Sequence, residues 1–388
     1  MIKEKGKKMT EKGKIFSVIM LCMLLFGDSS QGDVNIFGWA DGGFMTNSNV
    51  YSDSRQFGDS GYCFNTGIGL RTKLARYTPF KINYNLDING YFTYNLENEI
   101  FHSVKASLGH LVLDSIEVEL SGYIDYSNLL NSQLYNYQKI GALPTINWYL
   151  LDHTAISGTF IYDDMKYSGY NLDNQGIGYS AKLEQELSLY TSIKGIYSYK
   201  KADYSEKYLY SNISYAVPSY QSELRNDKET KIEIILSHDF SLDAGLNLIY
   251  QNIVFDSSDN FVDWGASQSE TLNSVIGDEK ILPDYRSYSG SSGGVKLKIT
   301  LEDSTFNILA FYSLKYYRSR PAKDSNDLFL QPEEKRKDQN TVLSIFWTKQ
   351  LQEWINLKLG TSYENNNSND ALFKYTKLDI TACLSTGF

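Results

Sequence analysis

Apolar and polar residues alternate one by one over most of the chain. In FKINYNLDING (80–90), Phe80, Ile82 and Tyr84 share one face, and Lys81 and Asn83 share the other. The same period of two recurs in IEVELSGYIDY (116–126), IGYSAKLEQELSL (177–189) and INLKLGTSY (355–363). A period of two predicts β-strands with one apolar and one polar face. We therefore expect an all-β protein.

About 16 such segments can be laid out, centred near residues 39, 68, 86, 106, 121, 143, 158, 182, 196, 234, 249, 297, 311, 345, 359 and 380. The count could also be 14 or 18, because YLYSNISYAV within residues 201–227 could form an extra hairpin. Pro144 cannot donate a backbone hydrogen bond, so we expect a bulge or the ragged end of a strand there.

The connections between these segments alternate in length. Short ones lie at 112–116, 240–245, 301–306 and 348–354, and long polar ones lie between them. The two longest are roughly 257–290 and 319–338. Short turns at one end and long loops at the other indicate an up-and-down antiparallel sheet.

Three features favour a transmembrane barrel over a soluble β-sandwich. The segments are often longer than the usual five or six residues of soluble strands. Lys and Glu occupy the polar face in mid-strand, which suits a water-filled interior. Aromatic residues gather near both ends of the segments, as at the two interfaces of a bilayer. They are Trp148, Tyr190, Phe240, Phe306, Trp354 and Phe388 near short turns, and Tyr94, Tyr126, Tyr199, Tyr316 and Tyr363 near long loops.

The last segment, KYTKLDITACLSTGF (374–388), alternates up to its final aromatic residue. Unpaired backbone groups are costly in hydrocarbon, so we expect this strand to pair with the first one near residues 34–45. The segment resembles the C-terminal assembly signal of bacterial outer-membrane β-barrel proteins, without indicating a subfamily. That resemblance implies location in the outer membrane and recognition by the barrel-insertion machinery, with Leu384 and Phe388 as signal residues.

Residues 1–32 have the layout of a secretory signal peptide, with a basic start, an apolar stretch and cleavage before Asp33. They hold six Lys against three acidic residues, so their removal takes the net charge from −9 to −12. An acidic exported chain is unsuited to binding nucleic acid. Residues 33–388 are then a single barrel domain that starts without a plug.

The sequence offers no catalytic residue, metal site or cofactor motif. The four His stand outside any nucleophile motif, and His102 and His110 are in phase with the apolar face. The acidic stretch 256–284 could bind a divalent cation or fold into the pore, but a solvated surface loop is the simpler interpretation. We expect Cys63 near the outer rim and Cys383 near the periplasmic rim, both as free thiols.

The polar face carries the candidate functional residues, which we expect to line a pore. They are Arg71, Lys73, Lys105, Glu117, Glu119, Lys182, Glu184, Glu186, Lys194, Lys231, Glu233, Lys296, Lys298 and Lys358. These charges could select solutes, or they could pair across strands and only keep the wall hydrated. Because both signs are interleaved, we expect no strong ion selectivity.

A barrel of about 16 strands is wide enough for an aqueous lumen. Passive passage of small hydrophilic solutes or of a polymer is therefore the leading hypothesis, with outer-membrane lipid and the insertion machinery as partners. The alternative is a non-enzymatic surface or secretion barrel, such as an adhesin or the barrel component of a polysaccharide-export or surface-protein assembly system. Residues 337–370 loosely resemble the last hairpins of such export barrels, whose helical repeats would have to come from an accessory periplasmic subunit.

Overall fold

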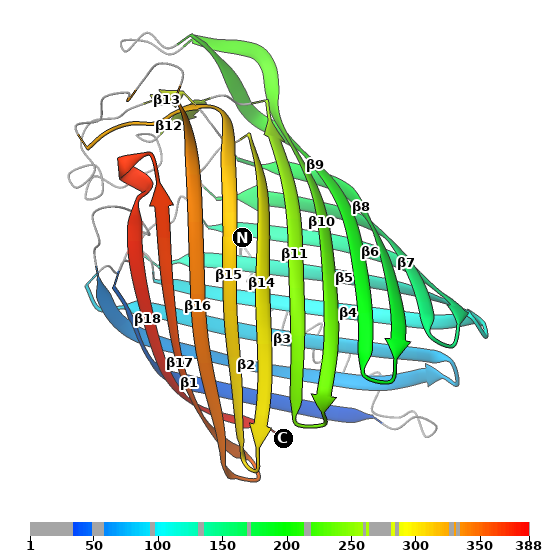
Figure 1. Ribbon diagram of the computed structural model, residues 1–388. Coiled ribbons are helices and arrows are strands. Elements are labelled where there is room, and N and C mark those ends of the chain that lie inside the picture. Colours follow the sequence, from blue (N-terminus) through cyan, green and yellow to red (C-terminus); the bar gives the residue numbers. More distant parts are fainter. Residues whose placement is uncertain are drawn as a thin grey trace, which may run out of the picture.

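Sixteen long strands form one closed antiparallel barrel (Figure 1). The computed structural model describes residues 34–48, 58–93, 98–130, 136–168, 172–212, 219–258, 261–263, 281–283, 287–325, 330 and 334–387. The strands are β1 (Asn35–Asn47), β2 (Asp59–Ala75), β3 (Thr78–Tyr91), β4 (Glu99–Leu113), β5 (Ile116–Leu129), β6 (Tyr137–Leu151), β7 (Thr154–Tyr167), β8 (Asn174–Ser188), β9 (Thr191–Asn212), β10 (Ser219–Ser241), β11 (Ala244–Ser257), β14 (Tyr288–Leu301), β15 (Ser304–Pro321), β16 (Lys335–Gln352), β17 (Ile355–Ser368) and β18 (Tyr375–Gly387). Each pairs with its neighbours in the chain, and β18 pairs with β1, which confirms the predicted architecture.

Seven turns of two residues connect the strands at one end of the barrel. In six of them the pairing shifts in register just beside the turn, as at Lys73/Ala75 and Gln350/Gln352. The seventh, between β14 and β15, keeps its register and instead has Glu302 at φ 50°. A bulge or a left-handed residue adjusts a tight hairpin to the twist of its strands.

The long connections lie at the other end, as predicted. The longest joins β11 to β14 and contains a small two-stranded sheet of β12 (Phe261–Asp263) and β13 (Ile281–Pro283). Strands β9 and β10 run to 22 and 23 residues and extend beyond their neighbours (Figure 1). Because Asn212 still pairs with Ser219, residues 201–212 and 219–227 belong to this long hairpin and add no strands to the barrel.

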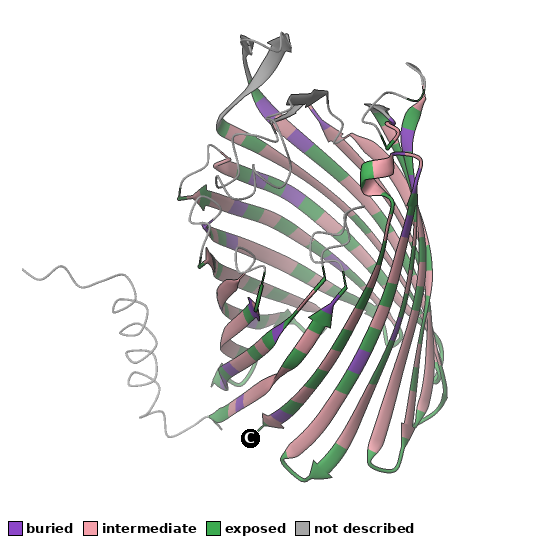
Figure 2. Ribbon diagram, turned by 90° about the vertical axis from the view of Figure 1, so that its left-hand side faces the viewer, coloured by how far each residue is buried: buried purple, intermediate pink, exposed green. Residues whose placement is uncertain are grey.

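Burial is inverted relative to a soluble protein. Among the described residues, only Leu70 and Ala322 are buried hydrophobic residues, whereas the buried polar residues are numerous. Large apolar side chains are exposed along the strands, including Leu120 and Ile146 at 56% each. Exposed positions recur along the strands of the barrel (Figure 2). A continuous apolar exterior requires an apolar environment, because soluble monomers rarely expose such a surface.

Most of the aromatic residues predicted near the strand ends are exposed where they are described, and Phe306 and Tyr199 are half-buried. Trp148, Phe240 and Trp354 lie by the short turns, and Tyr316 and Tyr363 lie toward the long connections. Phe388 and Tyr94 lie outside the described residues. The two groups mark opposite ends of the barrel, which is the placement of interfacial aromatic belts.

In the part of the chain that the structure describes, helical structure is confined to one short segment, η3 (Ala371–Phe373), between β17 and β18. Among the described residues, no helix has the length and apolar character needed to cross a membrane.

Pro144 lies inside β6, so the expectation of a bulge or a ragged strand end is wrong. It pairs with Leu120 of β5. Toward β7 the pairs at Leu143 and Pro144 are missing, yet Ala142 and Thr145 on either side keep the same register. The missing proline N–H therefore interrupts one ladder without shifting the strand.

Candidate functional site on the inner barrel wall

Because of the pairing register, the polar faces of neighbouring strands lie on the same side of the sheet all around the barrel. Arg71 lies opposite Lys81, Lys105 opposite Tyr123, and Glu184 opposite Lys194. All fourteen residues predicted for the pore lie on this inner face, and most of the exposed apolar residues lie on the outer one, with Phe346 and Tyr149 as inner-face exceptions. Leu384, predicted for barrel assembly, is on the outer face and 55% exposed, whereas Phe388 is outside the described residues.

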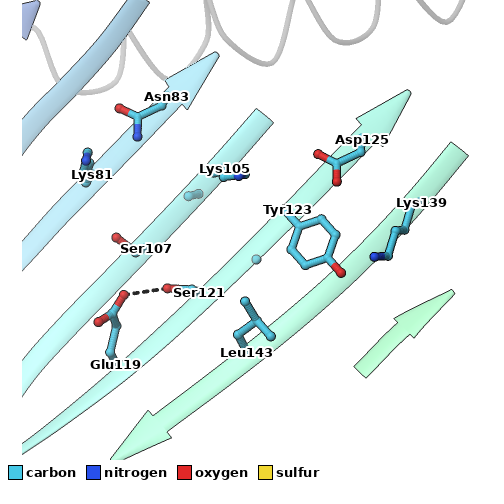
Figure 3. A pocket seen from close by; sticks show the side chains of 12 residues that line it. Lys81, Asn83, Lys105, Ser107, Glu119, Ser121, Tyr123, Asp125, Lys139 and Leu143 are labelled. Carbon is cyan, nitrogen blue, oxygen red and sulfur yellow. Dashed lines mark hydrogen bonds between the residues drawn. The ribbon is translucent and has the colours of Figure 1, made fainter. Parts of the chain in front are cut away.

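A hollow of about 350 Å³ lies on the inner wall across β3, β4, β5 and β6 (Figure 3). Its charged lining residues are Lys81, Lys105, Glu119, Asp125 and Lys139. The polar neutral residues are Asn83, Ser107, Ser121 and Tyr123. The Ser121 hydroxyl donates to Glu119 at 2.6 Å, so this carboxylate is already hydrogen-bonded. The hollow therefore offers ammonium groups, neutral hydrogen-bonding groups and the Asp125 carboxylate, which accepts the Ser103 hydroxyl at 2.7 Å, to a polar solute.

Positive charge accumulates beside this hollow. Arg71 and Lys81 lie directly opposite each other on β2 and β3, and both cationic groups lie about 6 Å from the centre of the Phe37 ring, at 6.0 and 5.9 Å. Like charges facing each other on neighbouring strands destabilise a sheet, and an aromatic face offsets part of that cost. Lys105 and Lys73 belong to the same patch, since they lie on the inner faces of the adjoining β4 and β2. We call Arg71, Lys73, Lys81 and Lys105 the basic patch.

A buried carboxylate lies near the basic patch. The Asp163 side chain is only 2% exposed and lies 2.7 Å from Lys200 Nζ and 3.9 Å from Lys139 Nζ. Gly176 makes room for this group, because a Cβ there would lie 2.4 Å from Asp163 Oδ1. Two ammonium groups compensate one buried charge, as a desolvated carboxylate requires. Sequence reasoning missed this trio, although all three residues are on the polar phase of their strands.

Charges of opposite sign also pair where the sequence interleaves them. The Glu184 carboxylate forms ion pairs with Lys182 Nζ at 3.2 Å and with Lys194 Nζ at 3.3 Å. Lys231 lies 3.0 Å from Glu233 on the same strand. These pairs match the interpretation of the wall charges as a hydrated, mutually neutralising network.

The remaining predicted carboxylates have polar partners, but several predicted cations do not. Glu117 accepts the Tyr149 hydroxyl at 3.1 Å, and Glu186 lies 2.9 Å from His153 Nδ1. The predicted cations without an ion pair in the described part of the chain are Arg71, Lys73, Lys105, Lys296 and Lys298. These unpaired cations lie on β2, β4 and β14, whereas Glu117 and Glu119 keep their negative charge on β5, so both signs remain on the wall in separate places.

Two Arg–Asp clasps hold the rim at the long-loop end. Arg225 binds Asp227 and Arg336 binds Asp338, each through two guanidinium nitrogens. Each carboxylate also accepts a serine hydroxyl from the next strand, Ser368 to Asp338 at 2.7 Å in the second case. A buried bidentate pair of this kind fixes geometry well. The second clasp lines a hollow of about 380 Å³ at the rim.

The two cysteines are free thiols in this structure and meet on the inner wall, so the expectation that they lie at opposite rims is wrong. Their Sγ atoms are 3.5 Å apart. Gly43 of β1 pairs with Cys63 of β2 on one side and with Cys383 of β18 on the other. Barrel strands are tilted and staggered, so distance from a strand end does not give height on the wall.

The four His residues each contact a polar side chain. His102 Nδ1 is 2.9 Å from the Tyr84 hydroxyl on the outer face, and His110 Nδ1 is 2.9 Å from Thr78 Oγ1. His238 Nδ1 is 2.8 Å from Thr191 Oγ1. Within the described residues, no three His, Cys, Asp or Glu side chains form a group that could hold a metal ion. Most of the acidic stretch 256–284 lies outside the described residues.

Comparison with solved structures places the fold among bacterial outer-membrane barrels. The chain is similar to OccAB1 of Acinetobacter baumannii, with a TM-score of 0.51, 11% identity, and coverage of 92% of this chain and 96% of that one. It is also similar to OmpT, an outer membrane protein of Vibrio cholerae, with a TM-score of 0.51, 6% identity, and coverage of 93% and 99%. No protein-family model and no curated protein matches the sequence. The chain therefore shares its barrel fold with these proteins.

Proposed function

We propose that this protein is an outer-membrane barrel that forms an aqueous pore for passive passage of small hydrophilic solutes. One observation carries the proposal. A closed barrel of sixteen strands has all fourteen of the predicted charged residues on its inner face and most of its exposed apolar side chains on the outer face. Barrels of sixteen to eighteen strands are wide enough to leave a water-filled channel. The polar wall would keep that channel wet and the apolar wall would face lipid.

We infer that the basic patch gives this pore a preference for anionic solutes, in place of the weak selectivity expected from the sequence, because these four cations gather on β2 to β4. Its four cationic groups have no ion pair among the described residues, whereas Glu184 and Glu233 are neutralised by lysines. Lys81 and Lys105 line the hollow, where Ser107 and Asn83 add neutral polar groups. Charges on a pore wall set a field that favours solutes of opposite sign. Small carboxylates and phosphates have the matching chemistry.

Assembly in the membrane follows from the last strand. Leu384 faces outward and pairs with Gly42 of β1 and Leu357 of β17, so it lies on the lipid side of the strand that closes the barrel. The insertion machinery would recognise this strand, with Leu384 and Phe388 as its signal residues. The proposal needs no cofactor and assigns no catalytic residue.

Conductance of purified, folded protein in planar lipid bilayers tests the proposal. We expect stepwise increases in current, and a reversal potential in a KCl gradient that favours chloride over potassium. A folded barrel that inserts and never conducts would contradict a pore. That outcome would instead favour the surface or secretion barrel, in which an accessory subunit supplies the active part.

A further inference from the structure

Cys63 and Cys383 face each other across an intervening strand at the seam of the barrel. They are 320 residues apart in the chain, yet their sulfur atoms are 3.5 Å apart on the inner wall. The ladders on both sides of β1 fix this relationship, because Cys63 and Cys383 share Gly43 as their register partner. The contact therefore follows from the pairing of the first and last strands.

Gly43 creates the gap in which the two thiols meet. A Cβ at this position would lie 2.7 Å from Cys383 Sγ, 2.6 Å from Cys383 Cα and 2.0 Å from the Ala382 carbonyl oxygen. Only glycine lets β18 approach β1 this closely. A larger residue would also collide with Cys383 Sγ, so the contact between the two thiols depends on this glycine.

We propose that Cys63 and Cys383 form a disulfide that covalently closes the barrel seam. Two regular strand spacings would separate the Cα atoms by about 9.6 Å, which is beyond the reach of a disulfide. With the sulfur atoms 3.5 Å apart, they need to come nearer by about 1.5 Å to reach bonding distance, so β2 and β18 must move toward each other over Gly43, which has no side chain to oppose that movement. The bond would tie β2 to β18 across β1.

A disulfide-bearing oxidant, such as a thiol-disulfide oxidase or oxidised glutathione, supplies the chemistry. One cysteine thiolate attacks the oxidant and forms a mixed disulfide, and one oxidant thiol leaves. The second cysteine thiolate then attacks the protein sulfur and releases the other oxidant thiol. In total the two cysteines lose two protons and two electrons, and the oxidant's disulfide becomes two thiols. An exported barrel meets such oxidants, because the periplasm is kept oxidising.

The test uses the purified, folded barrel treated with oxidised glutathione, followed by alkylation of free thiols, unfolding and trypsin digestion. We expect the peptides 56–71 and 378–388 to be joined, with a mass two hydrogens below their sum. The oxidised protein should also keep its folded gel mobility to a higher temperature than the reduced one. The variants C63S and C383S should lose both effects and still fold.

A folded barrel in which both cysteines carry glutathione or the alkyl group, with no joined peptide, would overturn the proposal. The variant G43A should give at least tenfold less joined peptide at an equal folded fraction. If G43A does not fold, the single cysteine variants and the thermal shift still decide the matter. Conductance is recorded separately on the same oxidised and reduced samples, so a barrel that conducts without crosslinking rejects this proposal alone.

Discussion

Lys358 of β17 and Asp41 of β1 are joined across the last strand, with Nζ 3.0 Å from Oδ2. The strand between them is β18, and Lys358 pairs there with Cys383 while Asp41 pairs with Ser385. The ion pair crosses β18 just as the thiol contact crosses β1. The seam between the two ends of the chain is thus held by side chains that skip a strand, in addition to the backbone ladder.

Removing one partner of this ion pair should weaken the seam slightly. Both groups are partly exposed to the lumen, so the variants K358M and D41N should each lower the free energy of unfolding by no more than about 1 kcal/mol. The double variant should reveal a coupling of about 0.2–1 kcal/mol by urea unfolding in lipid vesicles. Lys377 pairs with Asp379 on β18 and provides a control, since K377M should not couple to D41N. Zero coupling between positions 41 and 358 would contradict the contact.

The Arg336–Asp338 clasp should contribute far more to stability than the Lys358–Asp41 ion pair. Both side chains are buried, so D338A leaves a guanidinium without its counter-charge and should cost about 3–5 kcal/mol. S368A removes one hydrogen bond to the same carboxylate and should cost about 1.5 kcal/mol. Hydrogen exchange at the long-loop ends of β16 and β17 measures both. A larger effect from S368A than from D338A would show that the ion pair does not hold this rim.

The two faces of the wall should respond differently to the same charge. Leu120 faces outward and is 56% exposed, whereas Ser121 beside it faces inward and lines the hollow. L120R places a guanidinium in lipid and should destabilise the inserted barrel by about 2–4 kcal/mol. S121R places the guanidinium in water near Glu119 and should lower the stability of the inserted barrel much less. Equal losses in folding titrations with lipid vesicles would show that the outer face is not embedded.

Charge reversal in the basic patch should change ion selectivity. The variants K81E and K105E should each lower the chloride-to-potassium permeability ratio obtained from reversal potentials. The effect should be larger at 0.1 M than at 1 M salt, because the screening length falls from about 10 Å to about 3 Å. Lys374 is exposed on the connection before β18, so K374E makes the same charge change off the inner wall and is the control. A shift as large in K374E as in K105E would exclude a local effect of the patch.

The sequence by itself determined the local design of this protein. Each strand carries its own period of two, so the face on which Lys182 or Glu119 lies could be read within a few residues. The short turns and long connections are also local features, and together with the strand count they predicted an up-and-down barrel. Apolar and polar residues alternate because each strand has lipid on one side and water on the other, and this requirement is local to the strand.

Only the tertiary structure decided which residues of different strands meet. The contact of Cys63 with Cys383 and the burial of Asp163 between Lys139 and Lys200 depend on the stagger between strands, and no single strand encodes that stagger. Pro144 remains in β6 because its neighbours keep the register despite one missing N–H. The relative heights of the strands are fixed when the first and last strands pair and the barrel closes, which is a property of the whole chain.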